Sequence, residues 1–325
     1  VLVRNPHFRE WSSAAQPDGY PERIVLQTGY TDRQAVTRVI DGRADLLWFG
    51  ATSSTVEGLR TRYASQLYTN PGPFVAYLFL NTTKPPFDDP RARRAIAFAL
   101  DRRALADVSV GRATCQLIPP DFPAYKPYCP YTVRPGDGRW TGPDRAAADE
   151  LVERSGTLGA KVRLVVTTGR PFEETAEAGR QVVDVLDSLG YDASLRVMPY
   201  DDYWAFVFDP TSPFNAGLTM WAGDYPTASQ YVGAITSCDP DLGIFNLAHH
   251  CDPVMDARMV AAAQLQLTDP AAANAEWANL DRAAVRAAAV IPFSAIQQQD
   301  FVSHRVGNLS VHPLFGPLVA QMWVQ

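Results

Sequence analysis

The sequence predicts an α/β protein with mixed sheets flanked by helices. Strand-like and helix-like segments alternate between residues 161 and 224, an order typical of a sheet with helices on its faces. Two Ala-rich helical segments, separated by Thr268-Asp269-Pro270, lie closer to the C-terminal end. The 325 residues are 46% hydrophobic and 20% charged, so the chain is long enough for two globular domains or one large one.

The first predicted elements precede residue 82. A short apolar run, residues 24–27, ends in turn-forming residues, and Thr31 or Asp32 then caps a helix that ends at Asp41-Gly42. One face of this helix carries Ala35, Val36, Val39 and Ile40. The segment ADLLWF is expected to follow as a buried strand, and FVAYLFLN, residues 74–81, as another.

The next helix has a well-defined start. Asp89 is the predicted N-cap and Pro90 occupies the first helical position, where its missing N–H has no cost. The predicted apolar stripe consists of Ala92, Ala95, Ile96, Ala99 and Leu100. The side chains expected to remain in water are Arg91, Arg94, Arg102 and Arg103.

The middle of the chain carries the alternation. Strands are predicted at residues 161–169, 192–200 and 216–224, with one helix ending near Gly190 and a short one in DDYWAFVF. A final strand is predicted in IPFSAI. Because ligands of such sheets bind beyond the carboxyl ends of the strands, the loops Thr168–Phe172 and Trp221–Tyr225 are the first candidates for a site.

Charge and hydropathy exclude some functions. The net charge is −6, from 35 acidic and 29 basic side chains. No run of Lys and Arg is long enough to bind along a phosphate backbone, so no nucleic-acid partner is expected. No window approaches the roughly 20 apolar residues that span a bilayer. The chain opens on VLVRNP, so a signal segment and further N-terminal structure are expected to precede it.

The four cysteines form two local pairs, Cys115 with Cys129 and Cys238 with Cys251. Both pairs bracket loop-forming sequence, which predicts two disulfides and an oxidising, exported location. The rival interpretation is a metal site, because His249 and His250 precede Cys251. No CxxC or HExxH partner accompanies them, so no metal and no cofactor are expected.

An enzyme is the alternative to a binding protein. Asp201-Asp202, Glu173-Glu174 and Asp224 are candidates for a glycosidase carboxylate pair. Adjacent acids at helix starts more often stabilise the helix dipole. The sequence contains no GxSxG, P-loop or GxGxxG motif, and the prediction is therefore that the protein has no catalytic residues.

Several segments together resemble a known family. The stretch NTTKPPFDDPRARRAIAFALDRRAL, with LVRNP, QAVTRVIDGRADLLW, WAGDYP, CDPVMDARM and IPFS in this order, resembles the extracellular solute-binding proteins of ABC importers, specifically the peptide/nickel-binding family. The resemblance implies a two-lobed periplasmic-binding-protein-like fold of type II, in the peptide-binding class. Residues 1–75 and 296–325 would form a partial first lobe and residues 76–295 the second lobe. FVAYLFLN and the returning segment near Ile291 to Gln297 would be the hinge strands.

The resemblance also implies a binding site. In GRPFEE, Arg170 matches an arginine that holds the ligand carboxylate; in WAGDYP, Asp224 matches an aspartate that holds the ligand ammonium. Two positions depart from the family pattern, since Phe172 replaces a tyrosine and Thr227 an aspartate. Candidate ligand-binding residues are Arg170, Phe172, Trp221, Ala222, Gly223, Asp224 and Tyr225.

Plainer interpretations exist for each of these residues. Arg170 can be a solvated helix-entry residue, Asp224 can cap the turn before Tyr225, and Trp221 can belong to the core. For Tyr203 and Trp204, core packing is the better interpretation.

The function implied by the resemblance is capture of short peptides and their delivery to the permease subunits of an ABC importer. Such a protein is a monomer, extracellular or periplasmic, and is expected to be anchored as a lipoprotein through an N-terminal segment absent from this sequence. The alternatives are a binding protein for an oligosaccharide or other small solute and, less favoured, a secreted hydrolase.

Overall fold

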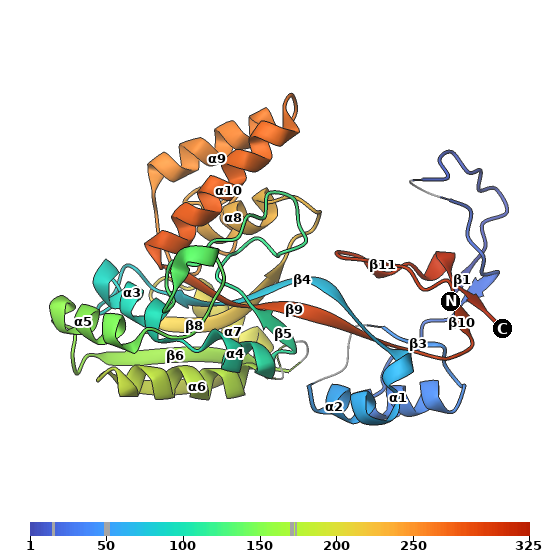
Figure 1. Ribbon diagram of the computed structural model, residues 1–325, viewed down its shortest axis with the longest axis horizontal. Coiled ribbons are helices and arrows are strands. Elements are labelled where there is room, and N and C mark those ends of the chain that lie inside the picture. The colour runs from blue at the N-terminus through green and yellow to red at the C-terminus, as the bar shows by residue number, and fades with distance from the viewer. Residues whose placement is uncertain (15–16, 49–52, 170–171, 173) are drawn as a thin grey trace. The chain divides into compact units, whose positions relative to one another are not determined.

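The computed structural model describes residues 1–14, 17–48, 53–169, 172 and 174–325 (Figure 1). The chain forms two compact units: unit 1 comprises Val1–Gly72 and Gln297–Gln325, and unit 2 comprises Pro73–Ile296. Two long strands, β4 (Leu67–Leu80) and β9 (Val290–Val302), begin in one unit and end in the other.

Unit 1 contains two helices and short paired strands. Its helices are α1 (Asp32–Ile40) and α2 (Ser53–Arg62), and its strand β3 (Leu46–Leu47) pairs with the end of β9. The other pairs are antiparallel: β1 (Leu2–Val3) with β2 (Arg23–Ile24), β10 (Val306–Gly307) with β13 (Trp323–Val324), and β11 (Val311–His312) with β12 (Gly316–Pro317). Short 3-10 turns occur at Ala64–Gln66 and Val319–Gln321.

Helix α1 confirms the predicted capping. Thr31 accepts a hydrogen bond from the Gln34 backbone N–H, and the Gln34 side chain accepts one from the Thr31 N–H. Gly42 has a φ of +69°, which places it just past the helix end. The apolar run at residues 24–27 contributes only Ile24 to a strand, and Leu26 is 61% exposed. Ile40, predicted for the apolar face, is also exposed. Of the four residues predicted for that face, only Val36 and Val39 are buried.

Unit 2 is built on a mixed sheet with the strand order β9-β4-β8-β6-β7, and β5 (Gly111–Ala113) also pairs with β9. Strand β6 (Lys161–Thr168) runs parallel to β7 (Asp192–Pro199) and to β8 (Ala216–Ala222), whereas β8 runs antiparallel to β4. The strand–helix alternation predicted a parallel or mixed sheet, and this prediction is confirmed. Helix α6 (Thr175–Ser188) lies along β6 and β7, and α9 (Pro253–Leu265) packs along α10 (Pro270–Ala287) (Figure 1).

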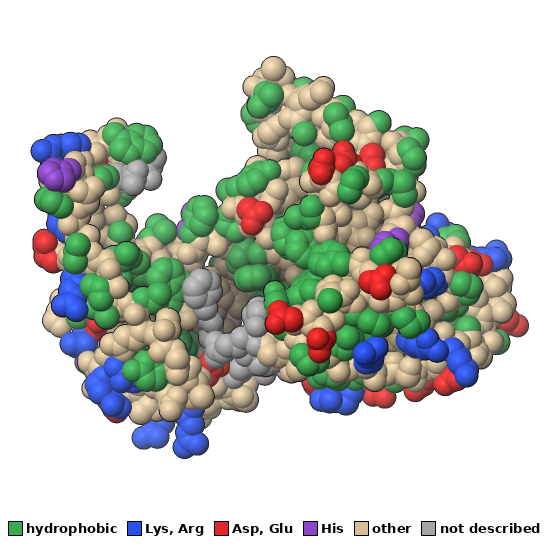
Figure 2. Space-filling view, turned by 180° about the vertical axis from the view of Figure 1, so that it is seen from behind, with side chains coloured by type: hydrophobic (Ala, Val, Ile, Leu, Met, Phe, Trp, Pro, Cys, Tyr) green, Lys and Arg blue, Asp and Glu red, His purple; other side chains and the backbone are tan. Residues whose placement is uncertain are grey.

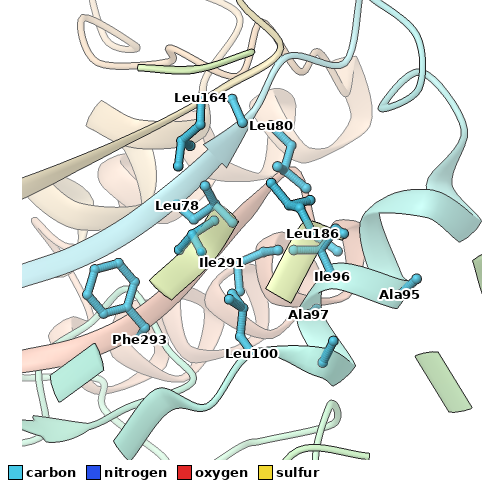
Figure 3. Packing of buried hydrophobic residues seen from close by; sticks show 14 of the residues in the cluster. Leu78, Leu80, Ala95, Ile96, Ala97, Leu100, Leu164, Leu186, Ile291 and Phe293 are labelled. Carbon is cyan, nitrogen blue, oxygen red and sulfur yellow. The ribbon is translucent and has the colours of Figure 1, made fainter. Parts of the chain in front are cut away.

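The core of unit 2 collects aliphatic side chains from elements far apart in the sequence (Figure 3). Leu78 and Leu80 come from β4, Leu164 from β6, Leu186 from α6 and Ile291 from β9, and all are nearly or fully buried. The other face of β4 is also covered, because Phe79 packs edge-on against Phe214 with ring centroids 5.9 Å apart. Burial on both faces explains why FVAYLFLN is a continuous apolar run.

Helix α3 (Pro90–Ala99) starts as predicted, with the Asp89 side chain accepting a hydrogen bond from the Arg91 N–H. All five residues of the predicted apolar stripe are buried. The remaining helices of unit 2 are α4 (Arg102–Val108), α5 (Arg145–Ser155), α7 (Tyr200–Phe208) and α8 (Ser229–Thr236), with a 3-10 turn at Pro135–Asp137.

The prediction that Arg102 lies in water is wrong. The first helix ends at Ala99 and a second one starts after Asp101, so Arg102 turns inward and is 1% exposed. Its guanidinium donates hydrogen bonds to the backbone oxygens of Ala97, Tyr131 and Pro292 at 3.0, 3.3 and 3.0 Å. Burial lowers the pKa of Arg102 to about 10. The side chain thereby ties the last turn of α3 to β9.

Both predicted disulfides are present. The Cα atoms of Cys115 and Cys129 are 5.2 Å apart, and those of Cys238 and Cys251 are 5.0 Å apart. The Cys251 sulfur is bonded to another sulfur, so the interpretation of Cys251 as a metal ligand is wrong. Among the described residues, no group of three or more His, Cys, Asp and Glu side chains is placed to hold a metal ion.

The loop closed by Cys115 and Cys129 is anchored on a buried carboxyl group. Asp281 is 0% exposed, and its side chain accepts hydrogen bonds from the Gln116 side chain at 2.7 Å and from the Leu117 N–H at 3.0 Å. Burial raises the pKa of Asp281 to about 7.

We expect Arg102→Ala to destabilise the protein by on the order of 3 kcal/mol or more, because three buried backbone carbonyls lose their donor. Arg103→Ala, one residue further along α4 and exposed, is the matched control and should change stability little. Unfolding in guanidinium chloride measures the free energy of unfolding of both variants. Equal effects of the two substitutions would contradict the role of Arg102.

The Asp281 pKa gives a pH dependence with a defined sign. Because the folded state holds this proton up to a pH of about 7 and the unfolded state releases it near the ordinary value of 3.8, stability falls as the pH rises between these values. We expect Asp281→Asn to flatten this fall in unfolding curves recorded from pH 4 to pH 7. An unchanged slope would show that another group causes it.

Candidate functional site

The candidate site lies where the parallel strands β6 and β8 end. Thr168 is the last residue of β6 and Ala222 the last residue of β8, and the two strands run in the same direction. In the neighbouring strand β4, Val75 pairs with Trp221 and Phe74 with Ala222. The chain therefore leaves the sheet after Thr168 and after Ala222 at the same end, the carboxyl end of the parallel strands, where ligands of such sheets bind.

The segment after β8 is held by one residue of the next helix. Gln230, near the start of α8, accepts a hydrogen bond from the Asp224 N–H through its side-chain oxygen at 3.0 Å. Its backbone oxygen accepts one from the Trp221 indole N–H at 2.5 Å. Gly223 is buried against the same residue, and a Cβ atom there would lie 2.9 Å from the Gln230 Cβ. Sequence patterns do not reveal Gln230, because its role depends on contacts across a turn.

This arrangement leaves the Asp224 carboxylate exposed to solvent. The turn that follows is closed by the backbone, with the Thr227 N–H donating to the Tyr225 oxygen at 2.8 Å, so Asp224 does not cap it. Within the described part of the chain, the Asp224 side chain has no hydrogen bond or ion pair. A fixed backbone with a free carboxylate is suited to bind a cation or an ammonium group.

Aromatic rings surround this edge of the sheet. We define the aromatic cluster by its ring contacts: it comprises Phe172, Tyr200, Trp204, Phe208, Trp221 and Phe245. The shortest contact joins Trp221 to Phe245, with ring centroids 4.2 Å apart. Tyr200 and Phe208 are about half exposed, at 45% and 49%. The cluster therefore gives the site a partly exposed apolar wall.

Three of these positions bear on the predictions. Phe172 is 6% exposed and packs on Tyr200 and Trp204, so in this structure it contacts protein side chains. The Trp204 indole N–H is buried and has no acceptor among the described residues. Phe245 was not predicted, because it lies in a loop 24 residues after Trp221 and no motif marks it.

Other predicted residues have clear positions. Tyr203 is 0% exposed and its hydroxyl donates to the Leu218 oxygen at 2.8 Å, which confirms the core interpretation. Asp201 and Asp202 lie exposed in the first turn of α7, where acids stabilise the helix dipole. Tyr225 is 50% exposed. Arg170 and Glu173 lie outside the described residues, so the site geometry does not include a distance between Arg170 and Asp224.

The surface of unit 2 also carries apolar side chains away from the deep core. Figure 2 shows a broad apolar patch on the face seen there, with scattered acidic side chains around it.

No helix in the described part of the chain has the length and hydropathy needed to cross a bilayer.

Comparisons with known proteins agree with this fold. The chain is 23% identical over 303 residues to the periplasmic oligopeptide-binding protein OppA of Salmonella typhimurium, which covers 90% of this chain and 51% of the relative. It is 28% identical over 222 residues to the probable di/tripeptide-binding protein 5 of Pseudomonas aeruginosa, covering 62% of this chain and 37% of the relative. The solved structure of HbpA2 from Haemophilus parasuis superposes with a TM-score of 0.79 at 19% identity, covering 94% of this chain and 59% of that one.

These matches show two further facts. The chain spans about half the length of the oligopeptide-binding relative that it matches. The family model of the bacterial extracellular solute-binding proteins, family 5, matches residues 1–242, which is well over half of the chain. With this match and the fold in common, the chain belongs to the bacterial extracellular solute-binding proteins of family 5.

Proposed function

We propose that this chain is part of a solute-binding component of an ABC importer and that it captures short peptides for a membrane permease. In this proposal, residues 76–295 form the second lobe, and residues 1–75 with 296–325 belong to the first. The protein acts as a monomer outside the cytoplasm, anchored at the membrane as a lipoprotein, and it catalyses no reaction.

The observation that carries the proposal is the exposed Asp224 carboxylate on a fixed backbone. Gln230 holds the segment at two points, the Trp221 indole N–H and the Asp224 backbone N–H. A short peptide has an ammonium group at one end, and a carboxylate at a strand end is a suitable acceptor for it. The aromatic cluster beside it offers apolar surface to a side chain of the peptide.

Two further points support a peptide as the ligand. The curated relatives described above are named for binding oligopeptides and di- or tripeptides. Arg170 occupies the position that the family pattern assigns to the ligand carboxylate, and a guanidinium pairs with a carboxylate through two parallel hydrogen bonds. A site that recognises both termini selects free peptides over blocked ones.

We expect Asp224→Asn to weaken the binding of a free tripeptide by about 30-fold or more, since removing one partner of a desolvated charge pair costs on the order of 2 to 5 kcal/mol. The same substitution should change the binding of the N-acetylated tripeptide far less, because that ligand has no ammonium group. Calorimetry on the complete protein measures both affinities. Asp192→Asn is the matched control, because this exposed carboxylate lies at the opposite, amino end of the parallel strands.

Arg170→Ala should show the complementary pattern. We expect it to weaken free peptides much more than C-terminally amidated ones, with Arg103→Ala, an exposed arginine of α4, as the control. If both site variants bind a free tripeptide as tightly as the parent, the peptide assignment fails and an oligosaccharide or another small solute becomes the better ligand. Mass spectrometry of the recovered peptide detects a hydrolase, since a binding protein returns its ligand unchanged.

A further inference from the structure

The two disulfide-closed loops both reach the candidate site. The loop between Cys238 and Cys251 contains Phe245, and the loop between Cys115 and Cys129 contains Phe122. Each of these phenylalanines packs against an aromatic residue that touches or belongs to the segment Trp221–Tyr225. Neither loop supplies a polar group to the site in the contacts of the described residues, so their contribution is made through packing.

The Phe245 contact is direct. Its backbone N–H donates to the Ala234 oxygen of α8 at 2.9 Å, and Asn246 bridges the base of the loop by donating to the oxygens of Ser237 and His250. The loop is thus fixed to α8, the helix that also carries Gln230. With its backbone fixed, the Phe245 ring lies 4.2 Å from the Trp221 ring and restricts where that indole can lie.

The Phe122 contact acts through Tyr231. The two rings are 5.2 Å apart in an edge-on arrangement, and Phe122 is 6% exposed. Tyr231 is fully buried, its hydroxyl donates to the Pro73 oxygen at 2.8 Å, and a Cβ atom on Gly223 would lie 3.2 Å from its ring. The ring of Tyr231 therefore packs against Gly223, the residue before Asp224.

We propose that Phe245 and Phe122 are positioning residues for the ligand site, each delivered by one disulfide-closed loop, and that together they hold the Trp221–Tyr225 segment in its binding geometry. This inference rests on the proposed function of Asp224 as the acceptor of a peptide ammonium group. Phe245 acts on Trp221 and Phe122 acts on Gly223 through Tyr231. A closed loop delivers its phenylalanine at a lower cost in conformational entropy than an open one, so each disulfide contributes to affinity as well as to stability.

The test uses the complete protein with trialanine and N-acetyl-trialanine as probes. We expect Phe245→Ala and Phe122→Ala to weaken trialanine binding about tenfold and to change the binding of N-acetyl-trialanine by less than about twofold, because the misplaced group is the acceptor of the ammonium. Phe245→Tyr, which keeps the ring, should restore the affinity. The double variant Cys238→Ser/Cys251→Ser should weaken trialanine in the same selective way.

Phe98→Ala is the matched control. Phe98 is half-buried like Phe245 and packs edge-on against an aromatic ring, that of Tyr131, at 5.0 Å, but it lies on α3. We expect a comparable fall in the melting temperature without a change in the affinity for either probe. Hydrogen exchange without ligand gives a second measurement: the amides of residues 221–225 should exchange faster in Phe245→Ala and Phe122→Ala than in the parent or in Phe98→Ala.

The outcomes separate the two proposals. If the parent binds no peptide, the proposed function fails, and hydrogen exchange alone then decides whether the phenylalanines position the segment. If the parent binds trialanine but both phenylalanine variants bind it equally well, the positioning role is refuted and the proposed function stands. Equal losses in Phe98→Ala and Phe245→Ala would also overturn the inference, because they would reflect stability alone.

Discussion

The structure of unit 2 depends on the antiparallel pairing of β8 with β4. Seven consecutive residues of β8, Ala216–Ala222, pair with Leu80–Phe74, and the partner residues Tyr77 to Leu80 are fully buried. Because both faces of this strand are buried, the register is specified by how individual side chains fit across the pair rather than by a difference between the two faces. Phe79 faces Gly217, where a Cβ atom would lie 2.3 Å from its ring, and this contact permits only glycine. The register therefore decides where Trp221 lies in the sheet and where the segment that carries Asp224 leaves it.

Some polar groups around the site are hydrogen-bonded within the protein, and the Asp224 carboxylate is available to a ligand. Within the described part of the chain, the Asp224 N–H, the Trp221 indole and the Gln230 side chain have partners, whereas the Asp224 carboxylate has none. A buried arginine of the same unit, Arg102, follows the opposite rule. All the hydrogen bonds that Arg102 donates go to backbone oxygens, so its charge serves the structure. The difference is that Arg102 is almost fully buried, at 1% exposed, whereas Asp224 is exposed.

The function that we propose for the site is recognition of a ligand, and its chemical groups can be compared with those that catalysis needs. A glycosidase needs two carboxyl groups facing each other across a bound substrate, and a nucleophile needs an adjacent base. The segment Trp221–Tyr225 offers one exposed carboxylate, that of Asp224, beside aromatic rings and on a backbone held by Gln230 of the next helix. In the proposed function, such a combination would orient a charged terminus of the ligand and cover an apolar side chain.

The sequence by itself determined the local structure, because capping and periodicity depend on neighbouring residues. Thr31, one of the two predicted candidates, and Asp89 are N-caps, and the parallel pairing of β6 with β7 agrees with the alternation of elements. Motifs also located Asp224 at a strand end. The tertiary structure decided what depends on distant contacts: the burial of Arg102 requires carbonyls from three separate segments, and the role of Phe245 requires a loop to fold back onto β8. Such contacts leave no periodic pattern in the chain, so packing alone decides them.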